Sequence, residues 1–395
     1  MPGGGSTTAT EPAPERRRPR LGRRFGRRDL LTALPYLLIF VVGLFAGCVH
    51  VARYTEFSPI DELRHVDYAM RAGSGQMPRF GDLLIQPAMR EEACRGLELA
   101  WNAPPCRSRS FDPVDFRDNG YQIASIHPPT YYVATGVFAR AAKALGLSHT
   151  FVDPARVWSA ILLGLGLAVA FGAGRVAGVR RLPLFAALVM VPVMPSALHS
   201  ASTVNPDSTA ILVGALVLLG ALLWERRRLP MWALVAVGVL STVVKFTSIL
   251  AVLVMAGVFV VRADPIGWWR RRRASGPAVP VPAGAAVDAS LVEPPTDEEP
   301  VAEASVDDDV EEEAGAVRLR STRDYLVGTV LMVGSAVAVA LLWSVIDRVR
   351  AVVAPEVIPQ IIQSKAHGWP GLSYFLGVNQ VFAWFPPING YDTPR

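Results

Sequence analysis

The sequence predicts an all-α fold, a polytopic bundle of about seven membrane-spanning helices. Of its 395 residues, 51% are hydrophobic and only 18% are charged, which suits a membrane protein better than a soluble enzyme. Apolar runs of about 20 residues recur along the chain, enough at ~1.5 Å per residue to cross a ~30 Å hydrocarbon core. Arginine clusters separate these runs, as in the short cytoplasmic loops of membrane proteins.

The first element is an N-terminal tail followed by a membrane helix. Residues 1–29 are rich in Pro, Gly, Ser and Thr and then strongly basic, which predicts a disordered cytoplasmic tail. The apolar run 30–52 lacks a convincing cleavage site, so we expect a retained helix rather than a signal peptide. Basic residues beside apolar runs favour contact with membrane lipid. The basic face with interleaved aromatic residues that would indicate a nucleic-acid partner is not seen.

The arginine clusters also predict the topology. They mark cytoplasmic loops, so the chain must cross the membrane an even number of times between any two of them. The segment 231–262 is too short for two full spans and too long for one, and an unpaired lysine inside the bilayer is costly. We therefore expect a hairpin of short helices that breaks near Lys245. The other predicted spans are 30–52, 155–174, 182–199, 207–224 and about 325–346.

The spans divide the chain into regions. A membrane core, 30–262, contains a long outer loop, 53–154. Within that loop, 129–147 carries Arg140 and Lys143, so we expect a helix on the membrane surface. The remaining regions are a disordered acidic cytoplasmic loop (263–323), a transmembrane helix (324–346) and an extracytoplasmic segment (347–395) whose abrupt end suggests a fragment.

This topology places three polar features on the outer side: the loop 53–154, the turn around Asp207 and the hairpin apex at Lys245. In the first of them, Ser58 and Pro59 predict a helix start. Helical spacing would then put Asp61, Glu62 and His65 on one face. Asp61 either closes a capping box or acts chemically. A carboxylate can serve as a general base, or it can position a divalent cation, which would then be the cofactor.

Four short motifs resemble the GT-C glycosyltransferases, in particular the protein-mannosyltransferase-like branch. The likeness is closer still to an uncharacterised family of bacterial membrane proteins related to that branch. It covers about residues 30–261. The motifs are Asp61-Glu62 after the first span, IHPPTYY at 126–132, NPDS at 205–208 and VVKFTSIL at 243–250.

The resemblance implies an inverting glycosyltransferase that takes sugar from a polyprenyl-phosphate-linked donor to an extracytoplasmic acceptor. It implies that Asp61 is the catalytic base with Glu62 beside it, that His127 lies near the site and that Asp207 helps hold metal or acceptor. The expected location is a bacterial plasma (inner) membrane, with the N-terminus cytoplasmic and the active face extracytoplasmic. The alternative is a non-enzymatic scaffold, or a transporter of lipid-linked saccharide, on the same fold.

Each remaining candidate has a structural explanation beside the functional one. His65 is a candidate substrate-binding residue through its position beside the acids, and Lys245 could bind a phosphate or simply mark a water-exposed apex. His127 could be an ordinary loop residue and Asp207 an N-terminal cap. Cys94 and Cys106 both fall in the outer loop, where an oxidising compartment would favour a disulfide.

Overall fold

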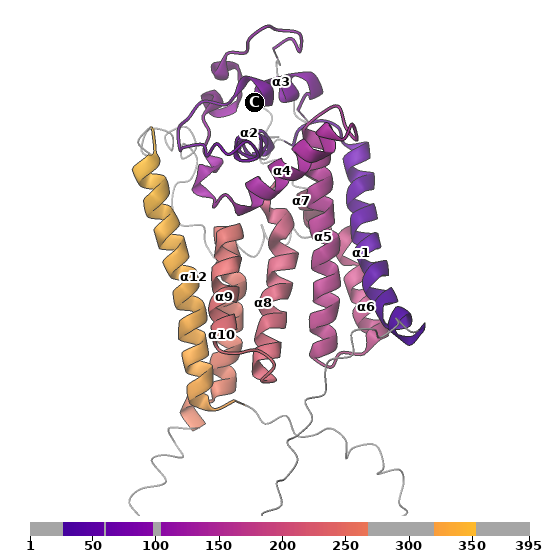
Figure 1. Ribbon diagram of the computed structural model, residues 1–395, viewed down its shortest axis with the longest axis vertical. Helices are drawn as coiled ribbons and strands as arrows, with labels where there is room; N and C mark the ends of the chain where they lie inside the picture. Colours follow the sequence, from indigo (N-terminus) through magenta and orange to yellow (C-terminus); the bar gives the residue numbers. More distant parts are fainter. Residues whose placement is uncertain (1–26, 59–60, 98–103, 268–319, 353–395) are drawn as a thin grey trace, which may run out of the picture.

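The computed structural model describes residues 27–58, 61–97, 104–267 and 320–352 (Figure 1). Apart from two isolated bridges, every regular element in these ranges is a helix. The prediction of an all-helical bundle is therefore confirmed. The predicted tail, most of the acidic loop and most of the C-terminal segment lie outside the described residues, at 1–26, 268–319 and 353–395.

In the described part of the chain, five helical segments are long and apolar enough to cross a membrane. Long helices are the expected form there, because helices satisfy every backbone polar group internally. The five are α1 (Arg27–Arg53), α5 (Val152–Val176), α8 (Ala210–Glu225, preceded by the 3-10 turn Pro206–Thr209), α10 (Ile249–Ala263, preceded by the 3-10 turn Phe246–Ser248) and α12 (Thr322–Arg350).

The predicted span 182–199 is a broken helix. It consists of α6 (Arg181–Val189) and α7 (Pro195–Ser202), which meet at 66°. Pro192 and Pro195 lie at the break, where proline removes a backbone donor and cannot continue a helix. By length and composition the described residues hold five candidate spans, or six if the bent pair counts as one, so the predicted count of about seven is not confirmed.

The segment 231–262 forms the expected pair of helices. Helix α9 (Trp232–Val244) ends at Lys245, whose backbone is extended, and α10 follows after a short 3-10 turn. With 13 residues, α9 is about 20 Å long and too short to cross a ~30 Å core. The two helices return to the end of the bundle from which they start, since Arg262 of α10 pairs with Glu225 of α8.

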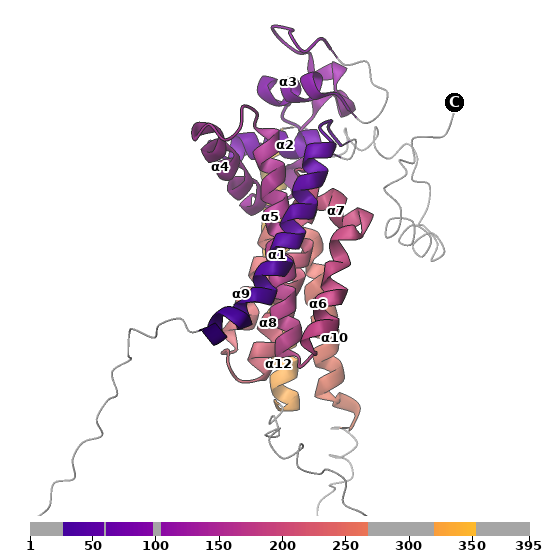
Figure 2. The same ribbon diagram turned by 90° about the vertical axis from the view of Figure 1, so that its right-hand side faces the viewer.

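The described residues between 54 and 151 fold over one end of the bundle, which we call the capped end (Figures 1 and 2). This cap holds α2 (Glu62–Ala72), α3 (Gln86–Arg95) and α4 (Thr130–Ala144). One apolar core runs from the cap into α5 and includes Phe57, Val66, Tyr132 and Ala155. The cap is therefore continuous with the bundle, and α4 is not among the helices that could span a membrane.

Helices α2 and α4 cross at two glycines. A Cβ on Gly136 would lie 2.8 Å from the Cα of Gly73 and would also contact the carbonyl oxygen of Ala69. Only residues without a side chain let the two backbones approach this closely. The crossing places His65 of α2 against Tyr132 of α4.

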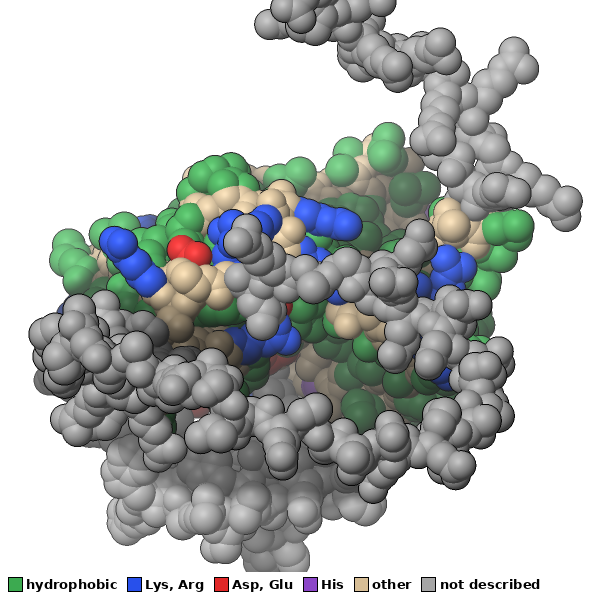
Figure 3. Space-filling model, turned by 90° about the horizontal axis from the view of Figure 1, so that it is seen from below, with side chains coloured by type: hydrophobic (Ala, Val, Ile, Leu, Met, Phe, Trp, Pro, Cys, Tyr) green, Lys and Arg blue, Asp and Glu red, His purple; other side chains and the backbone are tan. Residues whose placement is uncertain are grey.

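The opposite end of the bundle carries the two arginine clusters that lie within the described residues, at 175–181 and 226–228. Helices α5 and α8 end there, and residues 175–181 and 226–228 follow those helix ends (Figure 1). Figure 3 views this end and shows Lys and Arg side chains on the surface between apolar ones. The start of α12 is held here by Tyr325, whose hydroxyl donates to Glu225 over 2.6 Å. Arg320 lies 4.7 Å above the Trp224 ring.

Candidate functional site

The carboxylate of Glu62 joins three segments of the capped end. Arg156, in the first turns of α5, donates to both its oxygens over 2.8 and 2.7 Å. The backbone N–H of Val204 donates over 2.9 Å, and that of Ser58 over 2.8 Å. Glu62 and Arg156 are both buried. Burying a charged pair is favourable only with such complete hydrogen bonding, so this geometry favours a structural role for Glu62.

Asp61, next to it, has a different environment. Its side chain is 50% exposed, and its Oδ1 lies 2.5 Å from Nη1 of Arg64. Arg64 is itself buried and also pairs with Asp118. Asp61 is the N-cap of α2 with φ 56°, in the left-handed region, and its side chain makes no capping bond. Such strained residues concentrate at functional sites. The helix begins at Glu62, after the predicted start at residues 58–59, and the Ser58 hydroxyl contacts His199 instead.

Two histidines lie beside these acids. The ring of His65 is buried and its Nδ1 lies 2.8 Å from the hydroxyl of Tyr132. The ring of His127 is 6.0 Å away between centroids, and its Nδ1 is buried without a hydrogen-bond partner among the described residues. Burial, followed by repulsion from Lys245, lowers the pKa of His127 to about 4. Burial also lowers the pKa of His65 well below its usual value, so both rings are neutral at pH 7.

Asp207 and Lys245 form an ion pair that connects the turn before α8 with the break between α9 and α10. The Asp207 side chain is 44% exposed, whereas that of Lys245 is 10% exposed. Asn205 caps this turn by accepting from the N–H of Asp207. Lys245, Asp207 and Asp61 all influence the pKa of His127. The charges of the three polar features that the sequence indicates therefore all act on one buried imidazole.

Sequence reasoning missed the arginines that organise the site. Arg156 lies within the predicted span 155–174, where a charged residue in an apolar run signals a buried partner. Its remaining donors bond the carbonyl oxygens of Tyr54 and Glu56 over 2.8 and 2.6 Å. Arg64 gave no comparable signal, because an arginine in a polar helix is normally solvated. Helix α2 is in fact buried on nearly all sides, so the predicted polar and apolar faces do not separate.

An apolar cavity of about 400 Å³ lies below this cluster. It runs between α5, α8 and α9 and reaches up to Tyr131 of α4. Its upper end includes Thr209 and Val244, close in sequence to Asp207 and Lys245. Trp158 also lines it, with an indole N–H that is buried without a partner in the described structure. The wall is formed by Leu162, Leu212, Leu216, Val217, Val237 and Leu240, among others.

Within the described ranges, no three His, Cys, Asp or Glu side chains are grouped so as to hold a metal ion. Asp207 is neutralised by Lys245 and Asp61 by Arg64, which leaves neither carboxylate free to attract a cation. These residues therefore do not fit the divalent cation that the sequence suggested.

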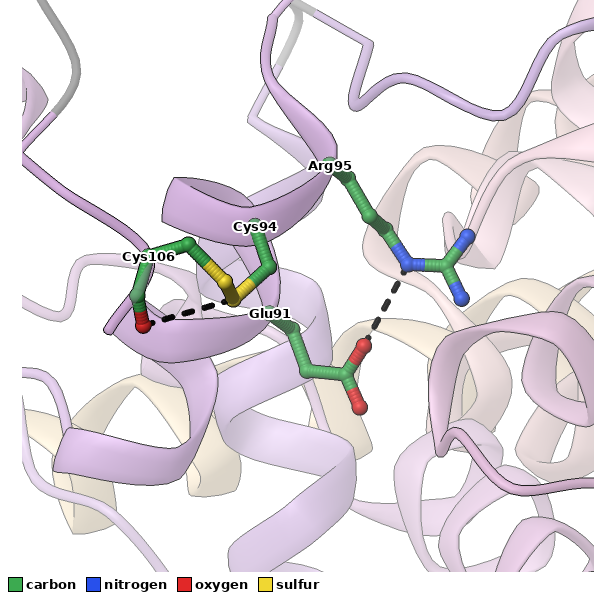
Figure 4. The surroundings of a disulfide bond; sticks show 4 residues. All are labelled: Glu91, Cys94, Arg95 and Cys106. Atoms are coloured by element: carbon green, nitrogen blue, oxygen red, sulfur yellow. Dashed lines mark hydrogen bonds and ion pairs between the residues drawn. A yellow bond between two sulfur atoms is a disulfide. The ribbon is translucent and has the colours of Figure 1, made fainter.

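A disulfide joins Cys94, in the last turn of α3, to Cys106, with 4.5 Å between their Cα atoms (Figure 4). The neighbouring Glu91 and Arg95 form an ion pair on the same helix, with Arg95 Nε 3.3 Å from Oε2. The disulfide thus closes the chain that follows α3 onto that helix.

Comparison with known proteins identifies one family. No curated protein and no solved structure matches the chain. The model of the family described as "Predicted membrane protein (DUF2142)" matches residues 67–370, which include α3 to α12 and most of the cap. This stretch is well over half of the sequence. The apolar helices agree with that description, and the chain belongs to the DUF2142 family of membrane proteins.

Proposed function

We propose that this chain is an integral membrane glycosyltransferase that moves a sugar from a polyprenyl-phosphate donor to an acceptor at the capped end. One observation carries the proposal. A half-exposed carboxylate, two neutral histidines and a lysine are gathered directly above an apolar cavity between helices. This combination suits a substrate whose reactive head is a sugar phosphate and whose tail is a hydrocarbon.

In this proposal, Asp61 is the general base. An acceptor hydroxyl oxygen attacks the anomeric carbon of the sugar as the bond from that carbon to the phosphate oxygen breaks. The hydroxyl proton passes to Asp61, and the polyprenyl phosphate leaves with the bonding electron pair. Arg64 orients the Asp61 carboxylate through the 2.5 Å contact.

Lys245 supplies the positive charge at the leaving phosphate. Its ammonium is mostly buried, so its interaction with an anion is weakly screened by water. A donor phosphate would share this cation with Asp207. His127 and His65, held neutral by burial, are hydrogen-bonding groups for sugar hydroxyls rather than charges.

The apolar cavity would hold the first isoprene units of the donor. Its volume of about 400 Å³, its apolar wall and its position between α5, α8 and α9 suit a hydrocarbon chain. The arginine-rich end opposite the cap would face the cytoplasm by the positive-inside rule. The capped end would then face outward from a bacterial inner membrane, where lipid-linked sugars are used as donors.

Purified full-length chain in nanodiscs, given a polyprenyl-phosphate donor with labelled sugar and a mixture of acceptors, tests the proposal. We expect time-dependent release of polyprenyl phosphate together with label in a new product. If the chain binds the donor but releases neither polyprenyl phosphate nor labelled product, the result contradicts glycosyl transfer.

The saturated bonding of Glu62 and the mutual neutralisation of Asp207 and Lys245 favour a second candidate, a carrier of lipid-linked saccharide on the same scaffold. Such a carrier would bind the donor in the same cavity and leave it intact. In vesicles, it would move labelled donor between leaflets, whereas the transferase would consume it.

A further inference from the structure

A second cavity, of about 600 Å³, lies within the cap on the far side of α2 from Asp61. It is formed between α3 and the last turns of α4, and Met70 of α2 contributes to its wall. Met70 is nine residues after Asp61 along the helix, which places the two sites about 13 Å apart. Cys94 of the disulfide shown in Figure 4 borders the same cavity.

Three cations line this cavity: Arg90, Arg140 and Lys143. In the described structure none of them has a carboxylate within ion-pair distance, unlike the nearby Arg71 and Arg95. Arg140 donates only to the carbonyl oxygen of Met70, over 2.9 Å, and Arg90 lies 5.8 Å above the Phe111 ring. Their positive charges therefore remain available to a ligand.

Glu91 is the one carboxylate in the cavity wall, and it is already engaged. Its Oε1 accepts from the N–H of Phe151 over 3.1 Å, and its Oε2 accepts from Arg95 over 3.3 Å. Arg95 also pairs with Asp153 at 2.9 Å. The cavity thus keeps a net positive charge, which favours an anionic ligand.

The cavity lies at the level where the bundle meets the cap. Thr150 and Phe151 line it, and the candidate membrane span of α5 begins at the next residue, Val152. Beyond Lys143, Leu145 and Leu147 are 74% and 76% exposed. Exposed leucines next to basic side chains at the end of a span are typical of a membrane interface, where apolar groups enter lipid and cations meet phosphates.

We propose that this cavity binds the phosphate of an anionic phospholipid headgroup in the leaflet at the capped end. Arg140 and Lys143 lie one turn apart on α4 and approach the phosphate from one side, while Arg90 approaches from α3. The acyl chains extend past Leu145 and Leu147. The bound lipid would fix the height of the cap above the bilayer, and this role does not depend on glycosyl transfer.

The test uses the full chain purified in neutral detergent, with the unfolding temperature measured over a range of phosphatidylglycerol concentrations. A ligand that binds only the folded state raises this temperature. We compare Arg140→Gln/Lys143→Gln with the control Arg107→Gln/Arg109→Gln, which removes two exposed cations elsewhere in the cap. A third variant, Arg140→Lys/Lys143→Arg, keeps the charges.

We expect half-maximal stabilisation of the pocket variant to need about 30-fold more phosphatidylglycerol, since it lacks two cations that each contribute ~1 kcal/mol near a lipid surface. The control and the charge-keeping variant should behave as the wild type does, and without lipid all should unfold at similar temperatures. An equal loss of lipid stabilisation in the control variant would overturn the proposal, because it would mean that the lipid is attracted to basic residues anywhere on the protein surface. Equal stabilisation by phosphatidylcholine would also overturn it, since the cavity would then not recognise the net charge of the lipid. Equal stabilisation by inorganic phosphate would overturn it as well, since the cavity would then bind a soluble anion.

Discussion

Glu62 and Arg156 form a buried, doubly hydrogen-bonded ion pair that ties the start of α2 to the first turns of α5. The same carboxylate also accepts from the N–H of Val204 in the turn between α7 and α8. Asp207 lies in the same turn and pairs with Lys245. These contacts place three segments that are distant in sequence around one polar site.

Glu62→Gln should destabilise the protein by about 3–5 kcal/mol, because it leaves the Arg156 guanidinium buried without its counter-charge. Thermal unfolding in detergent and the yield of folded protein measure this effect. Replacing both partners, as Glu62→Leu/Arg156→Met, should recover part of the loss because no unpaired charge remains. A Glu62→Gln variant that folds normally but has lost only activity would contradict the structural role.

Gly136→Ala should also destabilise the cap. In an exposed helix this change stabilises by about 0.5–1 kcal/mol, but here the added Cβ meets the backbone of α2. We expect a net loss of about 1–3 kcal/mol, measured by thermal unfolding. Gly214→Ala in α8 is the matched control, because a Cβ there has no neighbour within 4 Å. Equal stability of the two variants would mean that α2 and α4 do not approach at Gly136.

Lys245→Gln should weaken binding of a polyprenyl-phosphate donor by about tenfold or more, because a mostly buried cation is removed from the phosphate. Asp207→Asn should bind the donor at least as well as the wild type, since the lysine no longer has an internal competitor. Donor binding can be measured by competition with a fluorescent analogue. Weaker binding in Asp207→Asn than in Lys245→Gln would assign the phosphate contact elsewhere.

Stability should depend on the protonation of His127. Its pKa is about 4 in the folded protein and near 6.5 when unfolded, so between these values the unfolded state binds more protons. Stability therefore rises with pH across this window, by up to ~1.4 kcal/mol per pH unit for this group, and is fully present above it. His127→Asn should show a shallower slope between pH 4 and 6.5. An unchanged slope would indicate that His127 is accessible to protons in the fold.

Much of the fold follows from patterns visible in the sequence. Apolar runs and arginine clusters locate the membrane helices and the break at Lys245. The bend between α6 and α7 and the shortness of α9 depend on where prolines and neighbouring helices end a turn, so counting apolar residues alone does not fix the number of full spans. The interior of the cap is less predictable, because α2 is polar in sequence and yet almost wholly buried.

The site was predictable in outline only. Charged residues near the ends of spans indicated Asp61, Asp207 and Lys245, whose charges all act on the pKa of His127. The adjacent Asp61 and Glu62 look equivalent in sequence, but Arg156, 94 residues later, buries only the second. Distant arginines decide which carboxylate stays accessible, and no local pattern carries that information.

The glycosyl-transfer proposal is tested most directly by comparing Asp61→Asn with Asp118→Asn, since both aspartates pair with Arg64 and only Asp61 is the proposed base. Rates of label transfer from a polyprenyl-phosphate sugar are measured for both variants, after thermal unfolding has shown both to be folded. We predict that Asp61→Asn lowers the rate by about 10²–10⁴-fold, the usual contribution of a general base, while Asp118→Asn stays within a few-fold of the wild type. Full transfer by Asp61→Asn, or an equal loss in both variants, would contradict the account.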